Sequence, residues 1–297
     1  MKNVSPLRYP GGKTQVYDFV KELVNLNETT TYIEPYMGGM GIALKLLVNN
    51  DVKQIMVNDY DRSIYAFWYS VLNHTNQLID KIESTPITIE EWKKQRKIQQ
   101  GKETCHDLLT LGFSTLFLNR TNRSGIIKAG VIGGLKQDGN YKLDCRFNKE
   151  KTIKKIRLIA SYKKQIKLYN IDAEKFIRLN ITKTKKSFTF FDPPYYSKGP
   201  GLYTNFYNHE NHLSLSNTIK NYMSNKNWIL TYDLSEEIFQ MYKEFKYEKY
   251  YLNYSVTKPS KGIEYIFYSN GLAVPENTIN IKKQIKKRPT QRRQANV

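Results

Sequence analysis

Apolar residues recur at helical spacing near the start of the chain and then cluster in short runs typical of strands. Residues 15–27 form an amphipathic helix pattern with apolar side chains at Val16, Phe19, Val20, Leu23 and Val24. Short strand-like runs at 31–33 and 54–57 flank a glycine-rich turn and a second apolar helix pattern at 41–47. This order predicts a β-turn-α-β unit, the building block of a parallel sheet.

The alternation of helices and strands resumes after a long, mostly helical stretch at residues 62–112. Residues 119–148 lack a helical period and carry five glycines among basic side chains, which predicts a hairpin and loops. Helices are expected at 149–164, from about 172, at 210–224 and at 235–244, and strands at 165–171, 187–191, 228–231, 247–256 and 263–268. The fold class is therefore predicted to be α/β.

Basic residues strongly outnumber acidic ones. The 47 Lys and Arg against 27 Asp and Glu give a net charge of +20, and the chain also carries 23 Tyr, 13 Phe and 3 Trp. Cations neutralise phosphates and aromatic rings stack on unpaired bases, so this combination indicates a nucleic-acid partner. A low-GC coding bias accounts for part of the lysine count, but it does not account for the shortage of acids. Residues 276–297 predict a basic disordered tail, which either is only solvated or attracts phosphates without specificity.

The cysteines and histidines do not predict a metal site. Cys105 and Cys145 lie far apart without CxxC spacing and are expected to be reduced thiols of a cytoplasmic protein. His209 and His212 share a helical spacing but lack a third ligand nearby. No run approaches the ~20 apolar residues of a membrane span, and the N-terminus lacks the apolar stretch of a secretory signal. Neither a metal nor a membrane partner is therefore expected, and the oligomeric state stays open.

The segment Asp192-Pro193-Pro194-Tyr195 follows the apolar run at 187–191. Each proline fixes its own φ and favours an extended residue before it, so Asp192 should leave the strand on a stiff backbone. The Pro193 carbonyl and the Asp192 carboxylate would then be two hydrogen-bond acceptors beside the Tyr195 ring, an arrangement that suits a planar heteroaromatic amine. The alternative is a strand edge that ends in a proline-rich turn without a catalytic role.

The glycine-rich turn at 38–41 lies where a doubly wound sheet binds a nucleotide, directly after the first strand. Asp59 ends the next strand, 20 residues after Gly39, and an acid there commonly accepts hydrogen bonds from ribose hydroxyls. Together they favour an adenosine-containing ligand, with a structural turn and a solvated acid as the alternative. The segment 8–14 is not a P-loop because its glycine spacing fails, so Lys13 is interpreted as a single cation before a helix.

Five motifs in this order resemble the Dam-type, alpha-class adenine-N6 DNA methyltransferases. They are RYPGGK at 8–13, IEPYMGGMG at 33–41, VNDYD at 57–61, NRTNRSG at 119–125 and FFDPPYY at 190–196. The resemblance covers roughly residues 5–270. It implies a Rossmann-like methyltransferase sheet with helices on both faces, formed by residues 1–61 and 160–272, and a mainly helical target-recognition domain with a hairpin inserted at 62–159.

The resemblance also implies S-adenosylmethionine as cofactor and double-stranded DNA as partner. Tyr9 and Lys13 would flank the cofactor, Glu34 and the turn residues Gly38, Gly39 and Gly41 would meet its methionine end, Asp59 its ribose and Asp172 its adenine ring. Asp192 would lie at the junction of cofactor and target base. One departure from close Dam relatives is Pro10, where those relatives commonly have alanine, which puts the local turn in doubt but keeps the aromatic residue and the lysine.

Catalysis would then rest on Asp192, Pro193, Pro194 and Tyr195, acting on an adenine that is flipped out of the duplex. DNA contacts are expected from Arg120, Asn122, Arg123 and Lys128, because arginine pairs with guanine and asparagine with adenine in the major groove. Contacts to phosphates alone are the alternative for these side chains. A methyltransferase acting on RNA or protein, and a DNA-binding relative without activity, are the rival functions.

Overall fold

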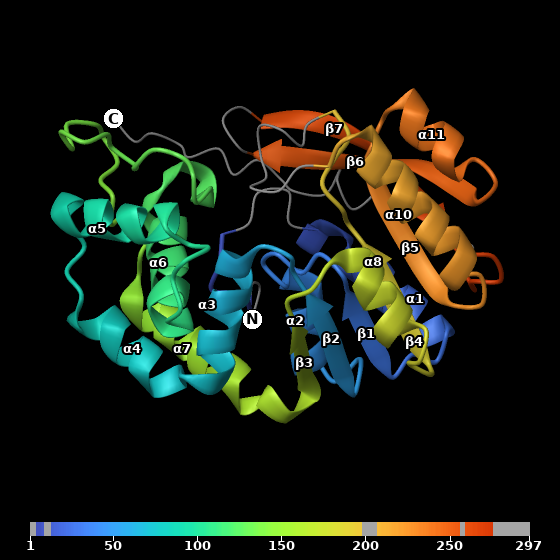
Figure 1. The fold of residues 1–297 in the computed structure, drawn as a ribbon, viewed down its shortest axis with the longest axis horizontal. Coiled ribbons are helices and arrows are strands. Elements are labelled where there is room, and N and C mark those ends of the chain that lie inside the picture. The colour runs from blue at the N-terminus through green and yellow to red at the C-terminus, as the bar shows by residue number, and fades with distance from the viewer. Residues whose placement is uncertain (1–3, 9–12, 198–206, 256–258, 276–297) are drawn as a thin grey trace, which may run out of the picture.

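A seven-stranded sheet forms the centre of the molecule (Figure 1). The computed structural model describes residues 4–8, 13–197, 207–255 and 259–275. The strand order is β3-β2-β1-β4-β5-β7-β6, in which β1 to β5 are parallel and β7 is antiparallel to both neighbours. The strands are β1 Thr31–Glu34, β2 Gln54–Asn58, β3 Ile166–Tyr169, β4 Ser187–Phe191, β5 Asn227–Asp233, β6 Lys246–Ser255 and β7 Pro259–Tyr268.

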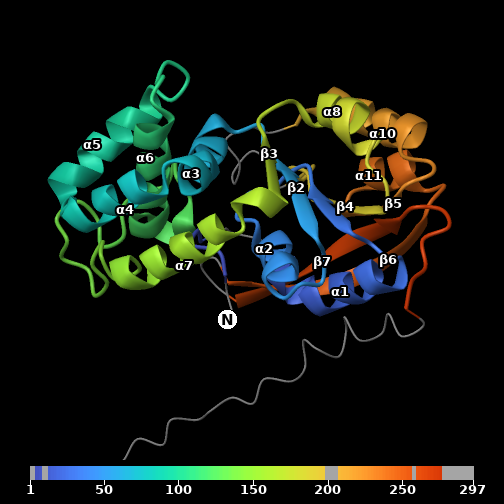
Figure 2. The same cartoon turned by 90° about the horizontal axis from the view of Figure 1, so that it is seen from below.

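Helices cover both faces of this sheet, which confirms the predicted α/β, Rossmann-like architecture (Figure 2). One face carries α1 (Tyr17–Leu26) and α2 (Gly41–Val48), and the other carries α8 (Ala173–Phe176), α10 (His209–Tyr222) and α11 (Glu236–Tyr242). The central strands β1 and β4 are buried along their whole length because both faces are covered.

Successive strand residues supply two separate apolar cores, as the two-residue period of a strand requires. Tyr32 of β1 packs into the core shared with α1 and α2, whereas the next residue, Ile33, packs into the core shared with α10 and α11. In β2, Ile55 and Val57 face the first core and Met56 faces the second.

Five further helices gather beside the sheet, at the end where β3 lies (Figure 1). They are α3 Arg62–Asn73, α4 Thr75–Ser84, α5 Ile89–Gln100, α6 Leu108–Thr121 and α7 Lys149–Ser161. Helix α6 is their centre and packs closely on α3, because a Cβ placed at Gly112 would lie 2.5 Å from the Ala66 carbonyl oxygen. A helix can approach another so closely only where the side chain is absent.

Three local features differ from the sequence prediction. The expected hairpin within 119–148 is reduced, among the described residues, to the 3₁₀ turn η2 (Arg123–Gly125) and one isolated antiparallel bridge between Asn122 and Val131. Strand β3 ends before Ile171, whose amide donates to the Asn58 side chain at 3.0 Å instead of pairing with a strand. The predicted helices also end in short turns of other helical types, namely η1 Lys13–Val16 before α1, η3 Lys163–Gln165 after α7 and the π-type turn η4 Ile177–Ile181 after α8. The predicted tail at 276–297 lies outside the described residues.

Candidate active site

Three acidic residues lie at one edge of the sheet, at the carboxyl ends of neighbouring parallel strands. Glu34 ends β1, Asp59 follows β2 and Asp192 follows β4. Strand β1 stands between β2 and β4, so the connections turn in opposite directions at this point. Open α/β sheets bind their ligands at such an edge. The site residues that the sequence predicted on these three strands are therefore neighbours in space.

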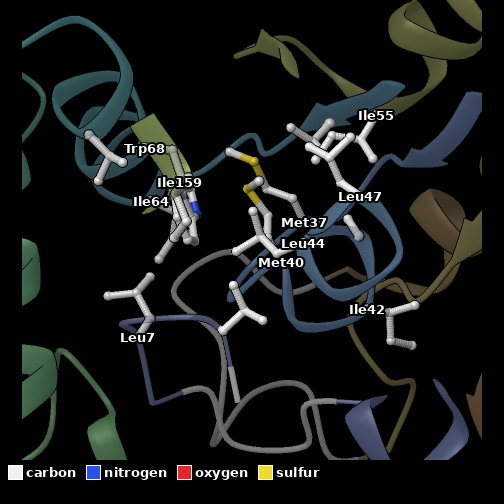
Figure 3. Packing of buried hydrophobic residues seen from close by; sticks show 14 of the residues in the cluster. Leu7, Met37, Met40, Ile42, Leu44, Leu47, Ile55, Ile64, Trp68 and Ile159 are labelled. Carbon is white, nitrogen blue, oxygen red and sulfur yellow. The ribbon is translucent and has the colours of Figure 1, made fainter. Parts of the chain in front are cut away.

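The turn between β1 and α2 uses left-handed backbone conformations at two positions, Gly38 with φ +41° and Met40 with φ +50°. Gly38 accepts a hydrogen bond from the Trp68 indole at 2.9 Å, which ties the turn to α3. Figure 3 shows Met37 and Met40 of this turn among buried residues that include Ile64 and Trp68.

The glycines leave room for neighbouring chain at the start of α2. A Cβ on Gly41 would lie 2.7 Å from Thr14 Cγ2, a distance that real contacts do not show. Glycine at this position therefore lets η1 pack against the first turn of α2. Gly39 lies within the same turn, so the three predicted glycines, Gly38, Gly39 and Gly41, lie together between the end of β1 and the start of α2.

Glu34 ends β1 with a side chain that is almost completely buried. Its Oε1 accepts a hydrogen bond from the Ala43 amide at 3.2 Å, in the first turn of α2. Burial raises the pKa of Glu34 to about 8, and the nearby Asp192 charge adds to that effect. The carboxyl group is therefore mostly protonated at neutral pH in the ligand-free protein.

Asp59 is held by backbone amides at the end of β2. Its two oxygens accept from Gly38 and from Asp61, each at 2.9 Å. Burial raises the pKa of Asp59 to about 7, and the charge of Asp61 contributes. The neighbouring Asn58 is completely buried and bonds both the Pro35 carbonyl and the Ile171 backbone, so it joins the ends of three strands.

Asp172 begins α8 beyond the end of β3. Its side chain is exposed, and Oδ1 caps the helix by accepting from the Lys175 amide at 3.0 Å. The carboxylate therefore already caps the helix, and its approach to the adenine ring of a cofactor stays a prediction.

Asp192 stands on the backbone that leaves β4, and its side chain is 27% exposed. Oδ1 is 3.1 Å from Lys13 Nζ, accepts from Thr231 at 2.8 Å and lies 3.5 Å from the Tyr195 hydroxyl. Its other oxygen, Oδ2, takes part in none of these three contacts. Burial raises the pKa of Asp192, the Lys13 charge opposes this shift, and the charge of Glu264 reinforces it.

Two residues that join the contacts around Lys13 and Tyr195 were not predicted from the sequence. They are Glu264 of β7 and Tyr250 of β6. Glu264 is completely buried, lies 3.2 Å from Lys13 Nζ, and accepts from the Tyr195 hydroxyl at 2.5 Å and from the Tyr250 hydroxyl. The signal that could have found it is an acid in an otherwise apolar strand, Ile263-Glu264-Tyr265-Ile266. Lys13 also donates to Tyr195, so its ammonium group contacts Asp192, Tyr195 and Glu264 together.

A third residue that was not predicted fixes the backbone after the segment Asp192-Pro193-Pro194-Tyr195. Asp233, at the end of β5, is buried and accepts from the amides of Tyr196 and Ser197, each at 3.0 Å. The Tyr195 ring is only 4% exposed and packs 6.4 Å from the Tyr232 ring. Pro193 is buried and Pro194 is partly buried, so this four-residue segment is a rigid element of the fold.

The residues predicted to contact DNA differ in their exposure. Asn122 is completely buried: its side chain accepts from the Trp92 indole at 2.7 Å and donates to the carbonyls of Ile126 and Ile127. In this structure it shapes the loop after α6, and a base contact would require these bonds to break. Arg123 and Lys128 are exposed on the same loop.

Arg120 lies in a cluster of cations. Its guanidinium group is largely buried beside Arg8 and Arg146, and burial together with these charges lowers the pKa of Arg120 to about 10. Lys155 lies near it as well and has its own pKa lowered, by burial first and by Arg120 second. Like charges held together in this way favour an anionic ligand such as a phosphate.

The N-terminal motif touches the motif that follows α6. Asn119 exchanges hydrogen bonds with the backbone of Arg8, donating at 2.8 Å and accepting at 2.8 Å. A Cβ on Gly125, whose φ is +78°, would lie 2.5 Å from the Arg8 carbonyl oxygen. Tyr9, predicted to flank the cofactor, lies outside the described residues.

No three His, Cys, Asp or Glu side chains with assigned positions converge as a metal site requires. None of the described helices combines the length and the apolar character needed to cross a membrane.

The chain is similar to a known protein family and to a characterised methyltransferase. A family model described as D12 class N6 adenine-specific DNA methyltransferase matches residues 9–256. The Type II methyltransferase M.MjaIII of Methanocaldococcus jannaschii is 24% identical over 210 residues, which span 64% of this chain and 68% of that protein. The family match includes the strands that carry Glu34, Asp59 and Asp192.

Proposed function

The chain belongs to the D12 class of N6 adenine-specific DNA methyltransferases, and from that premise we propose which residues perform each part of the reaction. It is an adenine-specific DNA methyltransferase. We propose that it acts at a specific sequence in double-stranded DNA and transfers the methyl group of S-adenosylmethionine to the exocyclic N6 amine of adenine. The amine cannot be reached inside a duplex, so the base is flipped out, which costs about a few kcal/mol.

The ends of β1 and β2 fit the cofactor by the chemistry of their side chains. Asp59 accepts one amide on each oxygen, and each carboxylate oxygen can accept a second hydrogen bond, as two ribose hydroxyls require. Glu34 and the turn at Gly38, Gly39 and Gly41 would hold the methionine end, where Glu34 can offer a negative charge to a cationic ligand. Asp172, with Tyr9 and Lys13, completes the proposed set. S-adenosylmethionine supplies an electrophilic methyl group carried on a sulfonium.

The catalytic step is assigned to the corner after β4. The lone pair of the adenine N6 amine is delocalised into the ring, so the amine is a weak nucleophile. We propose that Asp192 Oδ2 and the Pro193 carbonyl accept hydrogen bonds from its two N–H groups, which draws the nitrogen toward a pyramidal geometry and localises the pair. When this pair forms the new bond to the methyl carbon, the sulfur–methyl bond breaks and its electrons stay on the sulfur. The methylated nitrogen is then acidic and loses its surplus proton, so Asp192 need not be a strong base. Pro194 stiffens the backbone, and no covalent intermediate with the protein forms. Positioning and fixed dipoles then account for the acceleration.

Tyr195 is proposed to stack on the flipped base. Because only 4% of its surface is exposed, a base that stacks on it must displace part of what covers the ring. The Tyr195 hydroxyl is engaged with Glu264, so the ring plane is set before any base arrives.

Recognition is assigned to the inserted helices, residues 62–159, and to the loop after α6. The exposed side chains of Arg123 and Lys128 are proposed to contact DNA, with Arg123 reading a base edge. The cation cluster around Arg120 is proposed to hold a backbone phosphate. Asn122 is proposed to shape this loop from inside it.

The observation that carries the proposed mechanism is the partly exposed Asp192 carboxylate beside the Glu34 end of β1, at the sheet edge where ligands bind. Replacing Asp192 with alanine should lower methyl transfer to methyl-free duplex DNA by about 10³-fold or more, because the acceptor for the amine is lost. Transfer of a radiolabelled methyl group measures the loss. Cofactor binding, measured by calorimetry, should be unchanged.

Glu22→Ala is the matched control, because Glu22 is an exposed acid on α1, outside the residues assigned to the cofactor, the base or DNA. It should transfer methyl groups at the wild-type rate. Wild-type turnover by Asp192→Ala would reject this mechanism. A loss of cofactor binding together with activity would assign Asp192 to the cofactor instead.

A further inference from the structure

Glu264 is an acid in the interior of the protein with several close partners. It lies on β7, opposite Tyr250 of β6 in the strand register, and its side chain is completely buried. Oε1 accepts from the Tyr195 hydroxyl at 2.5 Å, and Oε2 accepts from Tyr250 and lies 3.2 Å from Lys13 Nζ. A carboxylate is kept at such a depth only by charge pairing and hydrogen bonds.

Lys13 stands between two carboxylates. Its side chain is 6% exposed, and Nζ lies 3.1 Å from Asp192 and 3.2 Å from Glu264. Lys13 also donates to the Tyr195 hydroxyl and lies 4.8 Å from the centre of that ring. Glu264 therefore holds, from the interior, both the cation and the ring that border the catalytic carboxylate.

This arrangement fixes the orientation of Asp192. Lys13 and Thr231 both bind Oδ1, at 3.1 and 2.8 Å, so the plane of the carboxylate is set by two partners on different elements. The other oxygen, Oδ2, stands outside these contacts and is the oxygen assigned above to the substrate amine. A lysine without its anchor would keep its charge but lose its fixed direction.

We propose that Glu264 is a positioning residue for methyl transfer, which holds Lys13 and Tyr195 against Asp192 so that Oδ2 faces the N6 amine. The assignment rests on the proposed role of Asp192. Glu264 touches neither reacting atom in this scheme, and it acts through the two side chains that it binds. The hairpin formed by β6 and β7 thereby contributes to a reaction whose predicted residues lie on other elements.

A purely structural role would not change the titration of Asp192 in the way that this role does. Two hydroxyl groups lie against Asp192 Oδ1, those of Tyr195 and of Thr231 from β5. The charged and titratable groups around it are Lys13 from η1, Glu264 from β7, Glu34 from β1 and the phenols of Tyr32 and Tyr232. Glu264 raises the pKa of Asp192 and Lys13 lowers it. Removing the charge of Glu264 should therefore move the acid limb of the transfer rate to lower pH, and removing that of Lys13 should move it to higher pH.

The experiment measures single-turnover methyl transfer against pH for the wild-type enzyme, Glu264→Gln, Lys13→Met and the double variant. Glu264→Gln should slow transfer by about 10²-fold, with the KM for DNA unchanged, because the acceptor is misplaced while DNA contacts stay intact. The two single variants should shift the acid limb in opposite directions. In the Lys13→Met background, the Glu264 substitution should slow transfer little further, because Glu264 acts on Asp192 through Lys13.

Two hydroxyl deletions keep the test valid if Glu264→Gln does not fold. Tyr195→Phe retains the ring and every charge but removes the bond to Glu264, and it should slow transfer by about tenfold. Tyr251→Phe, an exposed tyrosine on β6, is the matched control and should transfer at the wild-type rate.

A wild-type rate for Tyr195→Phe would overturn the proposal. So would a Glu264→Gln substitution that slows transfer as much in the Lys13→Met background as in the wild-type enzyme and leaves the acid limb unmoved. The assignment of Asp192 is tested separately. If Asp192→Ala is inactive while the Glu264 variant behaves as wild type, only the positioning role fails. If Asp192→Ala is active, the proposed mechanism itself fails.

Discussion

At the ends of β1 and β2, Glu34 and Asp59 accept hydrogen bonds from backbone amides, whereas at the end of β4 Asp192 is paired with the Lys13 cation. Among the described residues, no lysine or arginine lies within 4.0 Å of the Glu34 or Asp59 carboxyl oxygens. Burial raises the pKa of Glu34 to about 8 and that of Asp59 to about 7.

The proposed cofactor half contains Glu34 and Asp59, and the proposed catalytic half contains Asp192 and Lys13. We infer that the acids of the cofactor half change their protonation when a ligand binds, whereas the contacts of the catalytic half are already formed. On the proposed cofactor side, burial keeps the pKa values of Glu34 and Asp59 above their ordinary range, and among the described residues the Lys102 charge only partly opposes this for Asp59. The proposed catalytic half already contains its cation: Glu264 pairs with Lys13, and Thr231 donates to the Asp192 carboxylate that Lys13 also contacts. Three changes on the cofactor side should therefore give results unlike those expected for Asp192.

Replacing Asp59 with alanine should have the largest effect on the cofactor side. It removes the proposed acceptor of two hydroxyl hydrogen bonds and should weaken cofactor binding by about 10²-fold. The maximal rate at saturating cofactor should stay near the wild-type value, the reverse of the result expected for Asp192→Ala. Calorimetry and steady-state kinetics separate the two quantities.

Asp59→Asn, which keeps one carbonyl oxygen in the same place, should fall between the wild-type enzyme and Asp59→Ala. A reduced maximal rate with unchanged cofactor binding in either variant would end the division drawn here between the two halves.

Glu34→Gln should change how the stability of the ligand-free protein depends on pH. The pKa of Glu34 rises from 4.5 to about 8 on folding, so the folded protein holds a proton that the unfolded chain releases. This contribution is fully present below pH 4.5 and is lost as the pH rises through about 8. Glutamine resembles the protonated acid, so the variant should lose less stability than the wild-type protein between pH 5 and pH 8.

Thermal melting at several pH values measures this slope. Glu22→Gln, an exposed glutamate on α1, should leave the wild-type slope unchanged. An identical slope for Glu34→Gln and wild type would show that the buried acid does not take up a proton on folding.

Gly41→Ala should have the smallest effect of the three and tests how the two halves are joined. The added methyl group would meet Thr14 Cγ2 at 2.7 Å, and overpacking of this kind costs about 1–3 kcal/mol of stability. Thr14→Ser removes that Cγ2 atom and should restore most of the loss in the double variant. Chemical denaturation gives the values.

Gly130→Ala is the control for the glycine substitution, because nothing lies within 4 Å of the added atom. If Thr14→Ser does not restore the stability of Gly41→Ala, then the approach of η1 to α2 is not what requires the glycine.

Much of the fold could be predicted because it depends on short-range patterns. The strands that became β1, β2 and β4 show apolar runs, and the turn at Gly38 shows its glycines, so both the sheet edge and its acids follow from local sequence. The end of β3 was misplaced because the Ile171 amide bonds a side chain on another strand, which no local pattern reveals.

The residues missed at the site are those that distant pairing brings in. Thr231 contacts Asp192, and Glu264 contacts Lys13 and Tyr195 beside it, only through the order of β4, β5 and β7, which a single sequence does not encode locally. Asn122 was expected on the surface because its type suits base recognition. Whether a side chain of α6 or its following loop faces inward depends on the packing of Trp92 from α5, and residue type alone does not report it.

The bonds between Asn119 and the Arg8 backbone have a practical consequence for anyone who redesigns sequence preference. Residues 4–8 contact the inserted helices, yet Lys13, five positions later, contacts Tyr195 and Asp192 at the end of β4. A chimera that exchanges residues 62–159 for those of a relative would meet a foreign N-terminal segment along this seam. Exchanging residues 4–8 together with the helices would keep the graft and its host compatible.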